Sequence, residues 1–330
     1  MNEFLKGILD GINSIIGNYG WSVVVFTLLI RLVIMPFDYK SRVSMRKTQK
    51  IQPQLNALQK KYANDKEKLN KKMTELYQKE KINPLSSCLP MLLTMPILFA
   101  MFAAMRMVAG ENMAAQVFTL LQGEEPVLEG WLWIKNIWMP DSPFAPVLPD
   151  LYNLQMVEAN HWLAAFNALG ESAANLPIAL TADSFSNANI KATIEMIYAH
   201  LQTMPAYVEA TSTLPGWSFN LWIAQLDVMK NFNGFLILPV MSMLTQMLMT
   251  KVQPVSAPAE GQNNQQQQST GAFMKWFFPI FSLVICFSYN AIFAIYWVAA
   301  NIIATAQNVL INWYLDKKDK EATAVEGTVK

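Results

Sequence analysis

Five long apolar runs restrict the folds open to this chain more than any other feature. A helix needs about 20 mostly apolar residues to cross the hydrocarbon core of a bilayer. The runs predict membrane-spanning helices over residues 19–37, 88–109, 234–252, 273–289 and 291–315. Only 15% of the residues are charged, against about 25% in soluble domains. We therefore expect an all-α integral membrane protein built on a five-helix bundle, whose last two spans form a tight hairpin.

Charge is distributed unequally between the two long connections. Residues 38–87 hold thirteen Lys and Arg, whereas residues 111–234 hold three Lys and twelve acidic residues. The positive-inside rule places the first connection in the cytoplasm and the second outside. Five spans then leave the N-terminus outside and the tail 316–330 in the cytoplasm. The chain begins without the basic region of a secretory signal. Residues 1–18 instead predict an amphipathic helix, either lying on the outer interface or packed on the protein.

The cytoplasmic connection 38–87 predicts an antiparallel helical hairpin that turns at Asn64 and Asp65. The apolar positions of its two arms are Ile51, Leu55, Leu58 and Tyr62, then Leu69, Met73, Leu76 and Tyr77. Its basic faces carry Lys60, Lys61, Lys71 and Lys72. These faces are either solvated surfaces or a docking surface for a ribosome, a targeting factor or anionic lipid.

The outer connection 110–233 is a long extracytoplasmic insertion of mixed character. Its two similar tryptophan motifs, residues 131–137 and 220–226, place tryptophans where a membrane-interface belt would hold them. Between the motifs, patterns such as residues 190–202 predict an inserted helical subdomain. Residues 253–272 are rich in Pro, Ala, Gln and Asn and predict a flexible cytoplasmic linker.

Polar residues inside the predicted spans are the strongest functional signal. Arg31 lies in the first span with Thr27 one turn before it, and an arginine near a span centre costs about 2.5–3.5 kcal/mol on insertion scales. It either extends its side chain to the headgroups or faces a hydrated interior. The fifth span carries one polar stripe, formed by Asn301, Thr305, Asn308 and Asn312. The third span carries a polar face, formed by Ser242, Thr245 and Gln246. These groups either bond helices together or line a hydrated groove, and a long stripe beside an arginine favours the groove.

The second and third spans are rich in methionine. The second carries Met91, Met95, Met101 and Met105, and the third carries Met241, Met243, Met247 and Met249. Each single residue is explained by ordinary packing. As a set, they suit a surface along which varied apolar segments slide, because methionine adapts to irregular partners.

Several strings resemble the YidC/Oxa/Alb family of membrane protein insertases. They are residues 83–85 with 88–97 (NPL, CLPMLLTMPI), 51–55 (IQPQL), 31–36 (RLVIMP) and 295–301 (IYWVAAN). The resemblance covers the five spans and the cytoplasmic hairpin. The chain departs from the family in its long outer insertion, and we expect it to lack the large N-terminal periplasmic domain of some bacterial members.

The resemblance implies an insertase of the bacterial plasma membrane. It implies a groove open to the cytoplasm and to lipid, which receives a polar client segment while the hydrophobic segment leaves along the second and fifth spans. On this sequence Arg31 takes the charge role, and the candidate groove walls are Thr27, Gln246, Tyr296, Asn301, Thr305 and Asn308. Met91, Met95 and Met101 form the expected apolar slide.

The implied partners are nascent membrane proteins and the bilayer, with the ribosome, the signal recognition particle or its receptor, and the Sec translocon as further candidates. We expect that the protein is not an enzyme and needs no cofactor or metal. The sequence shows no phosphate-binding Gly-rich loop and no nucleophile–base pair, and both histidines, His161 and His200, fall in the outer connection. Two other functions remain open, a polytopic transporter and a membrane assembly chaperone that does not insert. A transporter would usually show inverted repeats, which are not found here.

Overall fold

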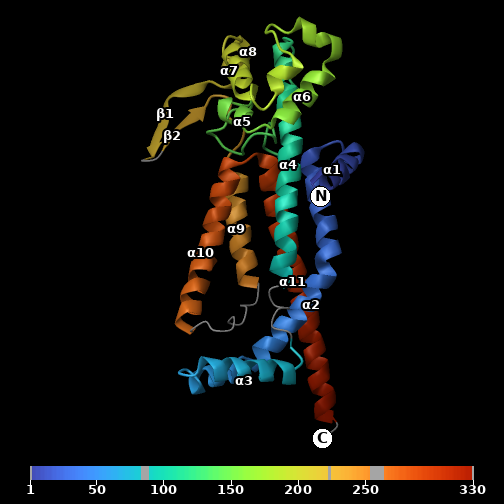
Figure 1. Ribbon diagram of the computed structural model, residues 1–330, viewed down its shortest axis with the longest axis vertical. Coiled ribbons are helices and arrows are strands. Elements are labelled where there is room, and N and C mark those ends of the chain that lie inside the picture. Colours follow the sequence, from blue (N-terminus) through green and yellow to red (C-terminus); the bar gives the residue numbers. More distant parts are fainter. Residues whose placement is uncertain (1, 83–88, 222–223, 253–263, 329–330) are drawn as a thin grey trace. The chain divides into compact units, whose positions relative to one another are not determined.

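The computed structural model describes residues 2–82, 89–221, 224–252 and 264–328, most of which are helical (Figure 1). The chain forms two compact units. Unit 1 contains Met1–Phe26, Ala100–Ser242 and Ser282–Val298, and unit 2 contains Thr27–Phe99, Met243–Phe281 and Ala299–Lys330.

Five helices contain the predicted spans, and each contributes residues to both units. They are α2 (Tyr19–Lys61), α4 (Leu89–Leu121), α9 (Ile237–Val252), α10 (Asn264–Ser288) and α11 (Ala291–Thr328). Among the described residues, three helical segments are long and apolar enough to cross a membrane: Tyr19–Lys61, Met95–Leu121 and Ala291–Glu321. The segments Ile237–Val252 and Lys275–Ser288 are shorter apolar helices. The protein is therefore a mostly helical membrane protein.

Helices extend beyond the ends of the apolar runs. Helix α2 continues through Asp38 into the predicted hairpin, and α4 continues twelve residues past position 109 to Leu121. The prediction of a flexible linker over 253–272 is wrong for its second half, because α10 begins at Asn264. Glutamine is a good helix former, so the Gln run extends the helix that follows it. Residues 253–263 lie outside the described residues.

Unit 1 contains α1 (Asn2–Ile16) and the predicted outer insertion. The insertion comprises α5 (Leu151–Gln155), α6 (Ala159–Ala168), η2 (Gly170–Asn175), η3 (Ala182–Phe185), α7 (Ile190–Leu201), α8 (Pro205–Ala210), β1 (Thr213–Leu221) and β2 (Ala224–Met229). The insertion also contains one antiparallel hairpin, β1–β2, within an otherwise mostly helical protein. Large apolar residues recur at every second position of β1, as is typical of a strand: Trp217, Phe219 and Leu221. The second tryptophan motif extends across both strands of this hairpin. Residues 222–223 lie outside the described residues.

Unit 2 contains the hairpin formed by α2 and α3 (Lys66–Lys79). The side chain of Asp65 caps α3 by accepting a hydrogen bond from the backbone N–H of Lys68 at 3.0 Å. The two arms bury one apolar cluster, made of Ile51, Leu55, Met73, Tyr77 and Ile82, with Leu58, Leu69 and Leu76 packed against it. Tyr62 instead lies under the ammonium groups of Lys61 and Lys68, each 5.7 Å from its ring centre.

Candidate functional site

Helix α2 presents a charged stripe within unit 2. Arg31, Asp38, Arg42 and Arg46 follow at i, i+7, i+11 and i+15, which places them on one helical face. Arg31 is partly buried, and Thr27, one turn before it, is 2% exposed. Arg31 and Arg42 both attract the carboxylate of Asp38 electrostatically. The predicted arginine therefore belongs to a longer row of ionisable groups.

Helix α11 presents the complementary polar stripe in the same unit. Asn301, Thr305 and Asn308 are only 6–8% exposed, and Gln307 beside them is 8% exposed. The stripe continues at the same spacing through Asn312 to Asp316. Burial of this many amide and hydroxyl groups is costly unless each has a hydrogen-bond partner or water.

Three contacts join helices α2 and α11 directly. Gln307 Nε2 donates to Asp38 Oδ2 at 2.8 Å, and Arg46 Nη2 donates to the backbone carbonyl of Asn312 at 2.9 Å. Arg46 Nη1 also lies 2.7 Å from Asp316 Oδ1. Helices α2 and α11 thus face each other with polar and charged side chains in unit 2.

Helix α9 adds the third polar face. Asn301 Nδ2 donates to Thr245 Oγ1 at 3.4 Å, and both side chains are buried. Gln246, the next residue on α9, is partly buried. This hydrogen bond joins the α11 stripe to α9.

The structure separates the remaining predicted site residues. Met95 is partly buried in unit 2, whereas Tyr296 and Met101 belong to unit 1, where they are 8% and 0% exposed. Met101 is thus fully buried in the structure, and its role in the predicted slide stays a prediction. The side chain of Met91 lies outside the described residues.

Sequence reasoning missed Asp38, Arg42, Arg46 and Gln307. The first three were assigned to the cytoplasmic connection because the apolar run ends at Phe37. Their spacing of i+7, i+11 and i+15 from Arg31 would have identified them, since helix α2 runs unbroken from Tyr19 to Lys61. Gln307 gave no such signal, because it lies one position away from the stripe that drew attention.

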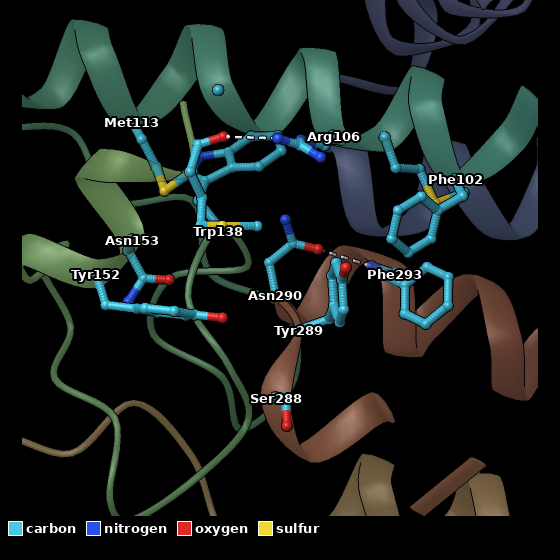
Figure 2. Close-up of a pocket in the computed structure, with 13 residues that line it drawn as sticks. Phe102, Arg106, Met113, Trp138, Tyr152, Asn153, Ser288, Tyr289, Asn290 and Phe293 are labelled. Atoms are coloured by element: carbon cyan, nitrogen blue, oxygen red, sulfur yellow. Dashed lines mark hydrogen bonds between the residues drawn. The ribbon is translucent and has the colours of Figure 1, made fainter. Parts of the chain in front are cut away.

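Unit 1 holds a small, largely aromatic cavity of about 50 Å³ (Figure 2). The Phe102 ring packs against Tyr289 and Phe293, with ring centres 4.8 and 5.1 Å away. Arg106 Nη2 donates to the backbone carbonyl of Met156 at 3.2 Å. A space of this size holds a few water molecules and no polypeptide segment. This cavity is therefore a packing feature and not a client site.

Comparison with known proteins identifies related sequences over nearly the whole chain. The family model described as "60Kd inner membrane protein" matches residues 11–208 and 192–318. A protein of Fusobacterium nucleatum named membrane protein insertase YidC is 42% identical over 106 residues, which cover 32% of this chain and 52% of that protein.

Two further relatives carry the same name. The Anaeromyxobacter dehalogenans protein is 37% identical over 149 residues, covering 44% of this chain and 24% of the relative. The Thioalkalivibrio sulfidiphilus protein is 34% identical over 151 residues, covering 46% and 24%. The chain thus matches about half or less of the length of these curated relatives.

Proposed function

Because this chain belongs to the 60Kd inner membrane protein family, we propose that it inserts nascent membrane proteins into the bacterial plasma membrane. The match supports the resemblance predicted from the span motifs. In the proposed topology α2, α4, α9, α10 and α11 all cross the bilayer, the N-terminus and residues 110–233 lie outside, and the C-terminus lies in the cytoplasm. The charge segregation between the two long connections supports this orientation.

The polar faces of unit 2 form the proposed client groove. The observation that carries this proposal is Arg31, partly buried within an apolar run, on the unit whose α11 buries Asn301, Thr305 and Asn308. A charged side chain at membrane depth normally faces a bundle interior or water. Thr27 and Gln246 complete the proposed walls in this unit.

The mechanism needs no bond-making chemistry. A client's apolar segment gains about 25 cal/mol for each Å² of apolar surface that leaves water. For an acidic segment that crosses outward, the membrane potential adds about 2.3 kcal/mol per charge per 100 mV. The protein lowers the barrier, because polar walls shorten the dry path and the Arg31 guanidinium attracts the acidic segment. Met91 and Met95 are proposed to contact the client's apolar segment as it enters lipid.

The hairpin of α2 and α3 is the proposed docking surface for the machinery that delivers clients. Its apolar cluster fixes the two arms, and Lys60, Lys61 and Lys71 are exposed while Lys72 is partly buried. Lys72 Nζ lies 2.5 Å from Glu75 Oε2, so this lysine is already paired. A ribosome, the signal recognition particle or its receptor, and the Sec translocon are the proposed partners.

The test is insertion of a purified single-span client into liposomes that contain this protein. The client carries a short acidic segment on its outer side, and a matched client carries the same segment without acidic residues. We expect ATP-independent insertion of both. Arg31→Ala should reduce insertion of the acidic client most, by about tenfold or more, because each charge-assisted interaction contributes about 1.5–3 kcal/mol. Arg31→Lys keeps the charge and should retain most of the activity.

The outcomes separate the competing functions. Equal insertion of both clients by wild type and Arg31→Ala would overturn the groove mechanism. A non-inserting assembly chaperone and a transporter would both leave insertion at the level of empty liposomes, and that result would overturn the proposed insertase function.

A further inference from the structure

Unit 2 contains a second charged feature further along the row that begins at Arg31, and Arg31 itself does not line it. A cavity of about 600 Å³ is lined by Arg42, Arg46, Gln49, Lys50, Lys251, Val252, Asn312, Asp316 and Asp319. Its volume lies within the range of about 300–1,000 Å³ that small-molecule pockets have. Four cationic side chains face two carboxylates, so the cavity is net positive and favours an anion.

The cations are not equally neutralised. Arg46 Nη1 lies 2.7 Å from Asp316 and 3.5 Å from Asp319, and Lys50 Nζ lies 3.3 Å from Asp319. Lys251, which is exposed at the end of α9, forms no ion pair with another described residue. The two carboxylates of the cavity are therefore used by Arg46 and Lys50.

Arg42 supplies the observation that points to a ligand. The residue is only 7% exposed, yet its Nη1 atom is buried without a hydrogen-bond partner among the described residues. Asp38 attracts Arg42, but the Oδ2 atom of Asp38 already accepts the Gln307 amide. A buried guanidinium nitrogen without an acceptor is costly. An anion in the cavity would remove that cost, because guanidinium binds phosphate through paired N–H donors.

The position of the cavity selects the source of the anion. Three residues that line the cavity lie close to the ends of apolar segments. Lys251 lies at the end of the apolar helix α9, and Arg42 comes five residues after the apolar run of α2 ends at Phe37. On α11, Asp316 follows the exposed Trp313 and Tyr314. Tryptophan and tyrosine concentrate where a bilayer meets water. Lipid phosphates lie at this level, and basic pockets between spans on the cytoplasmic side bind anionic headgroups.

We infer that this cavity binds the phosphate headgroup of an anionic phospholipid, with Arg42 and Lys251 as its principal ligands. Arg46 stays paired with Asp316 and fixes the wall of the cavity, while the acyl chains lie against the exposed apolar side chains nearby. The site is distinct from the proposed client groove, and its readout is lipid binding, independent of insertion.

The experiment measures lipid binding to the full-length protein in non-ionic detergent micelles by native mass spectrometry. Short-chain phosphatidylglycerol is titrated against phosphatidylcholine of the same chain length. Wild type should retain phosphatidylglycerol preferentially. Lys251→Gln should lower its affinity about fivefold, since one cation near an anionic headgroup contributes about that factor. Arg42→Gln should lower it at least as much, and Arg42→Lys should restore part of it.

Lys317→Gln with Lys318→Gln is the matched control, because it removes two exposed cations near the same end of α11 that do not line the cavity. This control should bind close to wild type. Lys251 is exposed, so its substitution tests the site even if Arg42→Gln fails to fold.

Three results would overturn the inference. The first is wild-type affinity in Lys251→Gln, and the second is an equal loss in the control pair. The third is displacement of the lipid by inorganic phosphate or an acidic peptide at concentrations equal to those of phosphatidylglycerol, which would assign the cavity to a free anion or to a client segment.

Discussion

The two units of this protein use buried polar side chains in opposite ways. In unit 1, Asp141 is fully buried and accepts hydrogen bonds from Trp133 Nε1 and from the backbone N–H groups of Phe235 and Leu238, at 3.2, 2.8 and 2.7 Å. Asn233 is also fully buried and donates to the backbone carbonyls of Asn136, Met139 and Pro140. Through these hydrogen bonds, each side chain connects backbone segments that are distant in the sequence, and the loops between helices are thereby fixed.

Unit 2 buries its polar groups mainly between helices. Hydrogen bonds in this unit join side chains of α2 and α11, such as Gln307 with Asp38, or of α9 and α11, such as Asn301 with Thr245. Arg42 is buried with a donor nitrogen that no described residue accepts. Unit 1 also holds buried polar atoms without an acceptor or donor partner among the described residues, such as His161 Nε2, so the two units differ in what their bonded polar groups join. Those of unit 1 fix loops, whereas those of unit 2 join charged and polar faces of neighbouring helices. Three stability experiments test that distinction, ordered here by expected effect.

Asp141→Ala should cause the largest loss of stability, because three hydrogen bonds to a buried carboxylate disappear and helix α9 loses an acceptor at its first turn. We expect the free energy of unfolding to fall by about 4.5 kcal/mol or more, since each of the three bonds to a charged group contributes about 1.5–3 kcal/mol. The measurement is the free energy of unfolding in detergent micelles. Glu171→Ala, which removes an exposed carboxylate of η2, should change it by less than about 0.5 kcal/mol. Equal effects would mean that Asp141 does not organise unit 1.

The Arg46–Asp316 pair should contribute a smaller, salt-dependent amount in unit 2. The side chains are 21% and 63% exposed, so solvent screens their attraction. A double-mutant cycle of Arg46→Gln and Asp316→Asn should give a coupling energy of at most about 1 kcal/mol, decreasing as salt is raised. The Lys50–Asp319 pair, with exposures of 70% and 52%, should show less. A coupling energy unaffected by salt would place this pair in a dry interior and contradict an open charged cavity.

Thr245→Val should have the smallest effect. The change preserves shape and removes the hydroxyl that accepts from Asn301, and interhelical hydrogen bonds of membrane proteins average about 0.6 kcal/mol. The same unfolding measurement applies, with Thr250→Val on α9 as the comparison. A loss well above about 1.7 kcal/mol would exceed the largest values measured for such bonds. The α11 stripe would then serve mainly to hold helices together, and the groove proposal would lose its support.

Much of the architecture follows from local patterns. The apolar runs predict the helices that carry the spans, and the spacing of Leu55, Met73 and Tyr77 predicts the faces that the α2–α3 hairpin buries. The arginine in the first run marks the unit that holds the polar faces. Other features gave weaker signals: the β1–β2 hairpin is short, and the helical start of α10 is hidden in a Gln-rich segment.

The sequence by itself determined which segments are apolar helices, how charge is divided between the long connections, and which residues share one face of one helix. These properties depend on periodicity and on neighbours a few positions away. Only the tertiary structure decided that Gln307 bonds Asp38 and that Arg46 reaches Asp316, pairs separated by about 270 residues. The reason is physical: a helix fixes the directions of its own side chains, but packing against other helices sets its rotation and therefore the partners those side chains meet.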